Sequence, residues 1–125
     1  MTKPSPDEAL SAPRDTSSRL LEFIVDEAPA PGSVTEVADG VHWLRFALPM
    51  KGLNHINLWA LKDRDNWVIV DTGIGDKESK KIWEGHFKNL MGGRPVDRVI
   101  CTHLHPDHTG LARWICRKFG APLLM

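Results

Sequence analysis

The chain has 125 residues and a mass of 14.0 kDa, a length that predicts one compact domain rather than two. Its 16 Lys and Arg residues balance 16 Asp and Glu residues, which disfavours a dedicated nucleic-acid-binding protein because phosphate binding needs surplus positive charge. Two cysteines do not make a secreted disulfide framework, and no run of eighteen apolar residues predicts a membrane segment, so we expect a soluble, cytoplasmic protein.

Residues 1–33 are predicted to form a flexible tail followed by a short helix. Residues 1–16 contain three prolines and a single large aliphatic residue, Leu10, and cannot bury enough apolar surface to offset their ordering entropy. Ser17 and Ser18 are suitable caps for a helix that reaches about Glu27 and stops before Pro29. Residues 34–125 are predicted to form the folded part of the chain.

Two hairpins are predicted first in this folded part. Residues 34–37 and 41–48 flank an Asp39-Gly40 turn, and Pro49 is expected to end the second of these strands. Residues 56–61 and 67–70 form the second hairpin, whose last strand is apolar on both faces and is therefore predicted to lie inside a sheet.

A helix, a strand and a further helix follow. Asp76 opens a helical pattern with one apolar stripe that the pair Gly92-Gly93 is expected to end. Residues 96–102 form an apolar strand, residues 111–119 are helical, and residues 123–125 resemble the beginning of another buried strand.

The strongest chemical signal lies directly after the strand at residues 96–102, in the pattern His103-x-His105-x-Asp107-His108. Side chains two apart in an extended segment point the same way, so His103 and His105 can face one cation. Pro106 bends the chain and lets Asp107 and His108 face a second position nearby. Imidazole nitrogens and a carboxylate suit zinc, iron or manganese. A solvated His-rich turn, or a helix cap formed by Asp107 or Thr109, is the structural alternative.

Three segments together resemble the metallo-β-lactamase-fold hydrolases. They are Asn-His-Ile-Asn-Leu-Trp at 54–59, Val-Ile-Val-Asp-Thr-Gly at 68–73 and Thr-His-Leu-His-Pro-Asp-His-Thr-Gly at 102–110. The resemblance spans residues 34–125 and implies an αββα sandwich with two divalent metal ions, zinc first, with iron or manganese as alternatives. It implies that His103 and His105 bind one ion and that Asp107 and His108 bind the other.

The resemblance also implies roles for two carboxylates and for the chain as a whole. Asp107 would orient a bridging hydroxide as the catalytic residue, and Asp71 would lie beneath the site and support the loop. Members of the family add further His ligands and a bridging carboxylate from the half of the domain that follows, whereas residues 109–125 contain no His, Asp or Glu. The chain is therefore predicted to be the first half of the domain.

The predicted function is a metal-dependent hydrolase that uses a metal-bound hydroxide on an ester, thioester, lactam or phosphodiester. A small-molecule substrate is expected, since zero net charge disfavours a nucleic acid. The 125-residue chain itself is predicted to be incomplete and inactive. The alternative function is a structural-zinc or interaction module that uses Cys101, His103, His105 and Cys116 as ligands.

Overall fold

The structure is a computed structural model and describes residues 22–125. The predicted tail and the start of the predicted N-terminal helix lie outside the described residues. The sequence predicts that this helix continues to Glu27, but residues 22–27 form bends and contain no helical turn. Phe23 and Ile24 are 80% and 83% exposed, so neither side chain has the packing that would stabilise a short helix.

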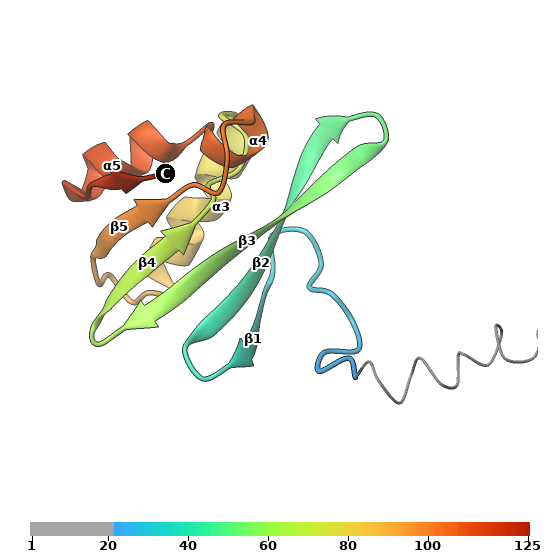
Figure 1. Cartoon of the computed structure of the whole chain (residues 1–125), viewed down its shortest axis with the longest axis horizontal. Helices are drawn as coiled ribbons and strands as arrows, with labels where there is room; N and C mark the ends of the chain where they lie inside the picture. The colour runs from blue at the N-terminus through green and yellow to red at the C-terminus, as the bar shows by residue number, and fades with distance from the viewer. Residues whose placement is uncertain (1–21) are drawn as a thin grey trace, which may run out of the picture.

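One mixed sheet of six strands forms the centre of the fold, with the strands in sequence order across it (Figure 1). The first four strands pair antiparallel, and the fifth and sixth join them in parallel. The strands are β1 Val34–Ala38, β2 Val41–Met50, β3 Leu53–Asp63, β4 Asn66–Val70, β5 Val96–Ile100 and β6 Leu123–Leu124.

The hairpin formed by β2 and β3 is longer than the sequence predicts. Pro49 does not end β2, which continues to Met50, and β3 begins at Leu53 after a two-residue turn. The pairing register shifts between Ala47 and Met50, and such an irregularity accommodates a proline that cannot donate a ladder hydrogen bond. Gly52 supplies the positive φ of 74° that the turn requires.

The described residues contain three helices. Helix α3, Lys77–Lys88, lies between β4 and β5 in the chain, and α4, Pro106–Thr109, and α5, Ala112–Phe119, lie between β5 and β6. The carboxylate of Asp76 caps α3 by accepting a hydrogen bond of 2.8 Å from the backbone N–H of Ser79, as its position in the sequence predicts. The helix ends at Lys88, four residues before the Gly92-Gly93 pair expected to end it, because residues 89–93 form turns whose N–H groups bond back to the last helical carbonyls.

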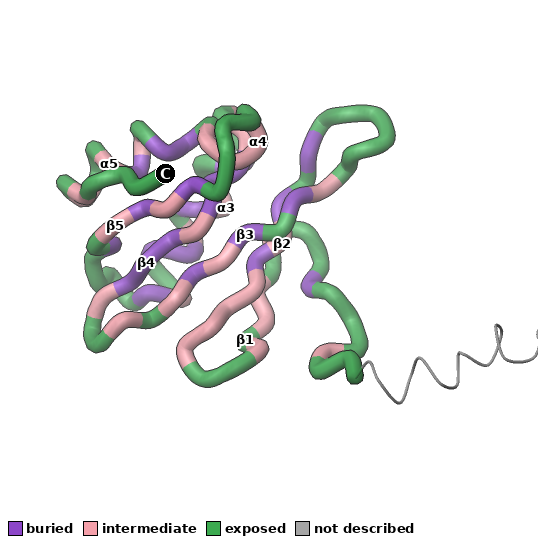
Figure 2. Tube along the Cα trace, in the orientation of Figure 1, coloured by how far each residue is buried: buried purple, intermediate pink, exposed green. Residues whose placement is uncertain are grey.

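The core lies between the sheet and the helices α3 and α5. Alternate residues of β2 and β3 are buried against these helices, and Figure 2 shows this alternation along both strands. Trp83 of α3 is fully buried, with its ring 5.2 Å from that of Phe46 of β2 and 5.5 Å from that of Phe87. The side chains between these core positions, such as Trp43 and Trp59, face away from the helices and stack at 5.9 Å.

This mixed sheet with helices is the α/β class that the sequence predicts. It contains one helical layer and one sheet layer of an αββα sandwich. The last strand differs from its prediction, because Leu123, Leu124 and Met125 are 48%, 47% and 67% exposed rather than buried. Leu123 and Leu124 pair with β5 at the edge of the sheet, where within the described residues no further strand lies beside them.

Candidate functional site

The predicted metal-binding motif lies at the ends of two neighbouring parallel strands. Residues 101–105 follow β5 and lead into α4, while Asp71 follows β4. Because β4 and β5 are parallel and adjacent, their carboxyl ends meet at the same edge of the sheet, and the two segments are brought together there (Figure 1). Residues 31 or more positions apart thereby meet in one site.

Asp71 joins the motif loop to the end of β4. Its carboxylate is buried and accepts hydrogen bonds from the backbone N–H of Thr102 at 2.8 Å and from the hydroxyl of Thr102 at 2.9 Å. Its own N–H donates to the carbonyl of Ile100 at 2.7 Å. Asp71 has a φ of 66°, a conformation that Asp and Asn tolerate better than most residues. The structure thus places this carboxylate beneath the loop.

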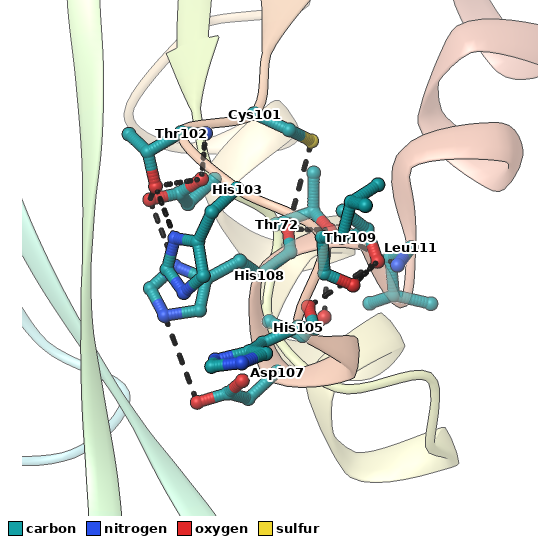
Figure 3. Close-up of polar contacts among 12 residues, drawn as sticks. Thr72, Cys101, Thr102, His103, His105, Asp107, His108, Thr109 and Leu111 are labelled. Carbon is teal, nitrogen blue, oxygen red and sulfur yellow. Dashed lines mark hydrogen bonds and ion pairs between the residues drawn. The ribbon is translucent and has the colours of Figure 1, made fainter. Parts of the chain in front are cut away.

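The three imidazole rings of the motif gather on one side of this loop (Figure 3). The ring centroid of His103 lies 3.9 Å from that of His108 and 4.7 Å from that of His105. His108 Nδ1 lies 2.9 Å from a carboxylate oxygen of Asp71, which is ion-pair distance although the ring is not aligned for a hydrogen bond. His103 Nδ1 lies 2.9 Å from the Thr102 hydroxyl. Both rings therefore have a polar partner at Nδ1.

Asp107 and His108 lie in α4, which begins directly after His105. Pro106 occupies the first helical position, where its missing N–H costs nothing. One carboxylate oxygen of Asp107 lies 3.7 Å from His108 Nε2, and His103 and His105 are exposed on the open side of the loop. The four predicted ligands are thus placed in one short segment, with solvent access to both histidines.

The side chains of the motif are of the types that bind metal ions, but they are not arranged around a single point. Imidazole nitrogen and carboxylate oxygen are suitable ligands for zinc or iron. Within residues 22–125, however, no three His, Cys, Asp or Glu side chains are placed so that they could hold one ion. The described residues therefore form no complete metal site by themselves.

The two cysteines of the alternative zinc module face the protein interior. Cys101 is buried, and its thiol donates to the carbonyl of His108 at 3.7 Å. Burial raises the pKa of Cys101 to about 11, with the negative charges of Asp71 and Cys116 adding to the shift. Burial also raises the pKa of Cys116. Because the thiolate is the metal-binding form, these environments disfavour both residues as ligands.

Thr72 also holds the site together, a role that the sequence pattern does not predict. Its N–H and its hydroxyl both donate to the carbonyl of His108 at 2.8 Å, and its hydroxyl accepts from the N–H of Leu111 at 3.0 Å. Its carbonyl accepts from the indole N–H of Trp83 at 2.7 Å. The position of Thr72 between Asp71 and Gly73, directly after β4, is the feature of the sequence that could have indicated this role.

Gly110 and Gly75 hold the same loop against the segment that follows β4. A Cβ on Gly110 would lie 2.5 Å from the N of Gly75 and 2.8 Å from the carbonyl oxygen of Gly73, so only glycine fits without a shift of the backbone. This close packing fixes the position of α4 relative to α3.

Comparisons with known proteins agree with this arrangement. The family model of the metallo-beta-lactamase superfamily matches residues 52–125. The chain is 27% identical over 81 residues to human acyl-coenzyme A thioesterase MBLAC2, a match that covers 59% of this chain and 28% of that protein.

Two solved structures extend the comparison. A beta-lactamase domain protein from Burkholderia ambifaria is 43% identical with a TM-score of 0.68, over 79% of this chain and 30% of its own. A metallo-beta-lactamase family protein from Thermus thermophilus is 30% identical with a TM-score of 0.59, over 68% of this chain and 28% of its own. The chain thus spans 28% to 30% of the length of these three proteins. With the family model covering more than half of its residues, the chain belongs to the metallo-beta-lactamase superfamily.

Proposed function

We propose that this chain carries the first set of metal ligands of a metal-dependent hydrolase. The observation that carries the proposal is the gathering of three imidazole rings and the Asp107 carboxylate in one loop, at the carboxyl ends of β4 and β5. Membership of a hydrolase superfamily supports it. In this proposal His103 and His105 bind one ion, and Asp107 and His108 bind the second.

The chain's own residues orient these ligands. A metal-bound imidazole usually has a carboxylate, carbonyl or other polar partner at its second nitrogen, which fixes the tautomer and the ring direction. Asp71 and Thr102 occupy that place at Nδ1 of His108 and of His103, which leaves Nε2 of each ring as the donor. Divalent ions bound there would supply an acidified water and polarise the substrate oxygen. Asp107 would orient the attacking water as a hydrogen-bond acceptor.

A small molecule with a carbonyl centre is the proposed substrate class, a thioester first and an ester or lactam next. The thioesterase relative supports the thioester, and the balanced charge of the chain disfavours a nucleic acid. No helix within residues 22–125 has the length and apolar character needed to cross a membrane. Free thiols at both cysteines are consistent with the cytoplasmic location that we propose.

The 125-residue chain is proposed to bind metal weakly and to lack turnover. Catalytic metal sites use three protein ligands for an ion, and within the described residues no three donors are placed around one point. Two imidazoles can still bind zinc, with water completing the coordination. Partial ligation without catalysis is the expected behaviour.

Zinc titration of the purified chain by calorimetry, combined with a thioester assay, tests the proposal. We expect His103→Ala and His108→Ala to weaken zinc binding about tenfold or more, because each removes a ligand. Cys116→Ala is the matched control and should leave binding unchanged. Thioester hydrolysis by the chain should not exceed that of His103→Ala.

Two results would contradict this proposal. Loss of zinc on replacing Cys116, with Asp107→Ala and His108→Ala unaffected, would favour the structural-zinc module instead. A clear metal-dependent rate above the His103→Ala control would refute the predicted inactivity while leaving the ligand assignment intact.

A further inference from the structure

The helical layer is positively charged although the whole chain is neutral. Helices α3 and α5 together contain seven Lys and Arg residues against two Glu, a surplus of five positive charges. Helix α5 contains no acidic residue at all. This local surplus is distinct from the metal-ligand loop and is not used by the proposed hydrolase function.

Part of this charge converges on a cavity of about 450 Å³ between the beginnings of α3 and α5. Three cationic side chains line it, Lys80 from α3 and Arg113 and Arg117 from α5, and no carboxylate does. Within residues 22–125 none of the three forms an ion pair. Their charges are therefore available to an anion.

The cavity is lined by an aromatic side chain and by closely packed backbone. Trp114 is half-buried, with its ring 6.1 Å from that of Phe87 on one side and the Lys80 ammonium 5.7 Å from its centroid. The cavity is also lined by Gly75 and Gly110, whose backbones are in close contact. An aromatic ring and closely packed backbone thus lie beside the three cations.

We propose that this cavity binds the diphosphate group of an organic phosphate ester, such as a nucleoside diphosphate. Arginine matches phosphate oxygens with paired N–H donors, and lysine adds a compact positive charge. The indole of Trp114 also lines the cavity and offers an apolar contact to the remainder of the ligand. The inference does not rest on the proposed hydrolase function.

The distribution of the charged residues favours a small anion over a nucleic acid or a lipid surface. Glu78 and Glu84 interrupt the cationic residues on the rest of the layer, and Glu84 pairs with Lys118 at 3.6 Å. An extended polyanion needs a continuous positive surface, whereas here the uninterrupted charge lies in one concave site.

Calorimetric titration of the full chain with ADP, in EDTA so that metal-bridged binding cannot contribute, tests the proposal. We expect ADP to bind with a dissociation constant of the order of 0.1 mM, weakening with added salt, and adenosine not to bind. Arg113→Ala/Arg117→Ala should weaken ADP binding at least about tenfold. The matched control Lys77→Ala/Lys88→Ala removes the same charge from α3 outside the cavity and should change binding less than about twofold.

Inorganic pyrophosphate forms a second arm of the experiment. Tighter binding of ADP than of pyrophosphate supports the assignment of the diphosphate to an organic ester, and equal binding overturns it in favour of a free polyphosphate. The proposal is also overturned if ADP and pyrophosphate both fail to bind, or if the control pair weakens binding as much as the arginine pair. Binding of single-stranded RNA or phosphatidylserine vesicles through these arginines, without binding of ADP, would overturn it as well.

Discussion

Replacing Gly110 by Ala should destabilise the fold because the new methyl group has no space. It would lie 2.5 Å from the N of Gly75, 2.6 Å from the carbonyl oxygen of Pro106 and 2.8 Å from that of Gly73. All three are backbone atoms, so no side chain can rotate away to relieve the contact. The backbone conformation itself is ordinary, with a φ of −56°, so the cost is one of packing alone.

The expected loss of stability is about 3 kcal/mol, at the upper end of the range for overpacking, because three contacts must be relieved at once. Relief requires α4 to move away from the segment after β4. That movement would break the hydrogen bonds from the N–H and hydroxyl of Thr72 to the carbonyl of His108. The amide of Thr72 should therefore exchange faster in the variant.

Urea unfolding measures the loss, and hydrogen exchange at Thr72 measures the movement. Gly85→Ala is the matched control. Gly85 lies in the middle of α3, and a Cβ added to it meets nothing within 4 Å. Helix propensity predicts that this control gains about 1 kcal/mol. A Gly110→Ala variant that stays within about 0.5 kcal/mol of the native chain, or a Gly85→Ala variant that loses as much stability as Gly110→Ala, would show that these backbone contacts do not control stability.

Substitutions at three further positions test the supports of the site and the core. Asp71→Ala should lower the free energy of unfolding in urea by about 3 kcal/mol, because it leaves the Thr102 N–H without its acceptor and puts Ala at a φ of 66°. Asp71→Asn should lower it clearly less, and equal losses would contradict this expectation. Trp83→Phe should cost about 2 kcal/mol by removing the donor to the Thr72 carbonyl and leaving a small void, and an unchanged thermal midpoint would count against it. Burial lowers the pKa of His86 in the folded chain. Below about pH 6.5, the ordinary pKa of histidine, the unfolded chain therefore takes up a proton on this ring more readily than the folded chain, and the free energy of unfolding falls as the pH falls. His86→Phe should remove this part of the dependence, and parallel stability curves between about pH 7 and 5 would contradict it.

Local patterns predicted most of the fold. Alternation of apolar and polar residues indicated the strands at residues 34–70, and the Asp39-Gly40 turn marked the first hairpin. Asp76 marked the start of α3. These signals were reliable because each depends on neighbouring residues, and tertiary packing then agrees with them.

The predictions that failed depend on tertiary packing and strand pairing, which a local sequence pattern does not contain. An N-terminal helix to Glu27 needs a surface to cover Phe23 and Ile24, and none is provided within the described residues. Pro49 would end a regular strand, but the register shift in β2 accommodates it. Leu123 is apolar yet lies at a sheet edge, where its burial depends on what packs beside it.

The motif of the candidate site is visible in the sequence, and the family resemblance places Asp71 beneath it, but the individual contacts that hold the loop are not visible in a local pattern. The spacing of His103, His105, Asp107 and His108 is visible in the sequence. The contact of Asp71 with His108, and the bonds of Thr72 to the same loop, join residues 36 or more positions apart. They arise only because β4 and β5 are adjacent and parallel.

We propose that His103 and His108, each with a polar partner at Nδ1, bind metal through Nε2. Two-bond proton–nitrogen NMR of the histidine rings during a zinc titration tests it most directly. We expect zinc to shift the Nε2 signals of His103 and His108 while their Nδ1 atoms stay protonated, and we expect the signals of His55 and of the cysteine Cβ atoms not to move. Ring signals that stay unchanged while Cys101 and Cys116 shift would contradict it.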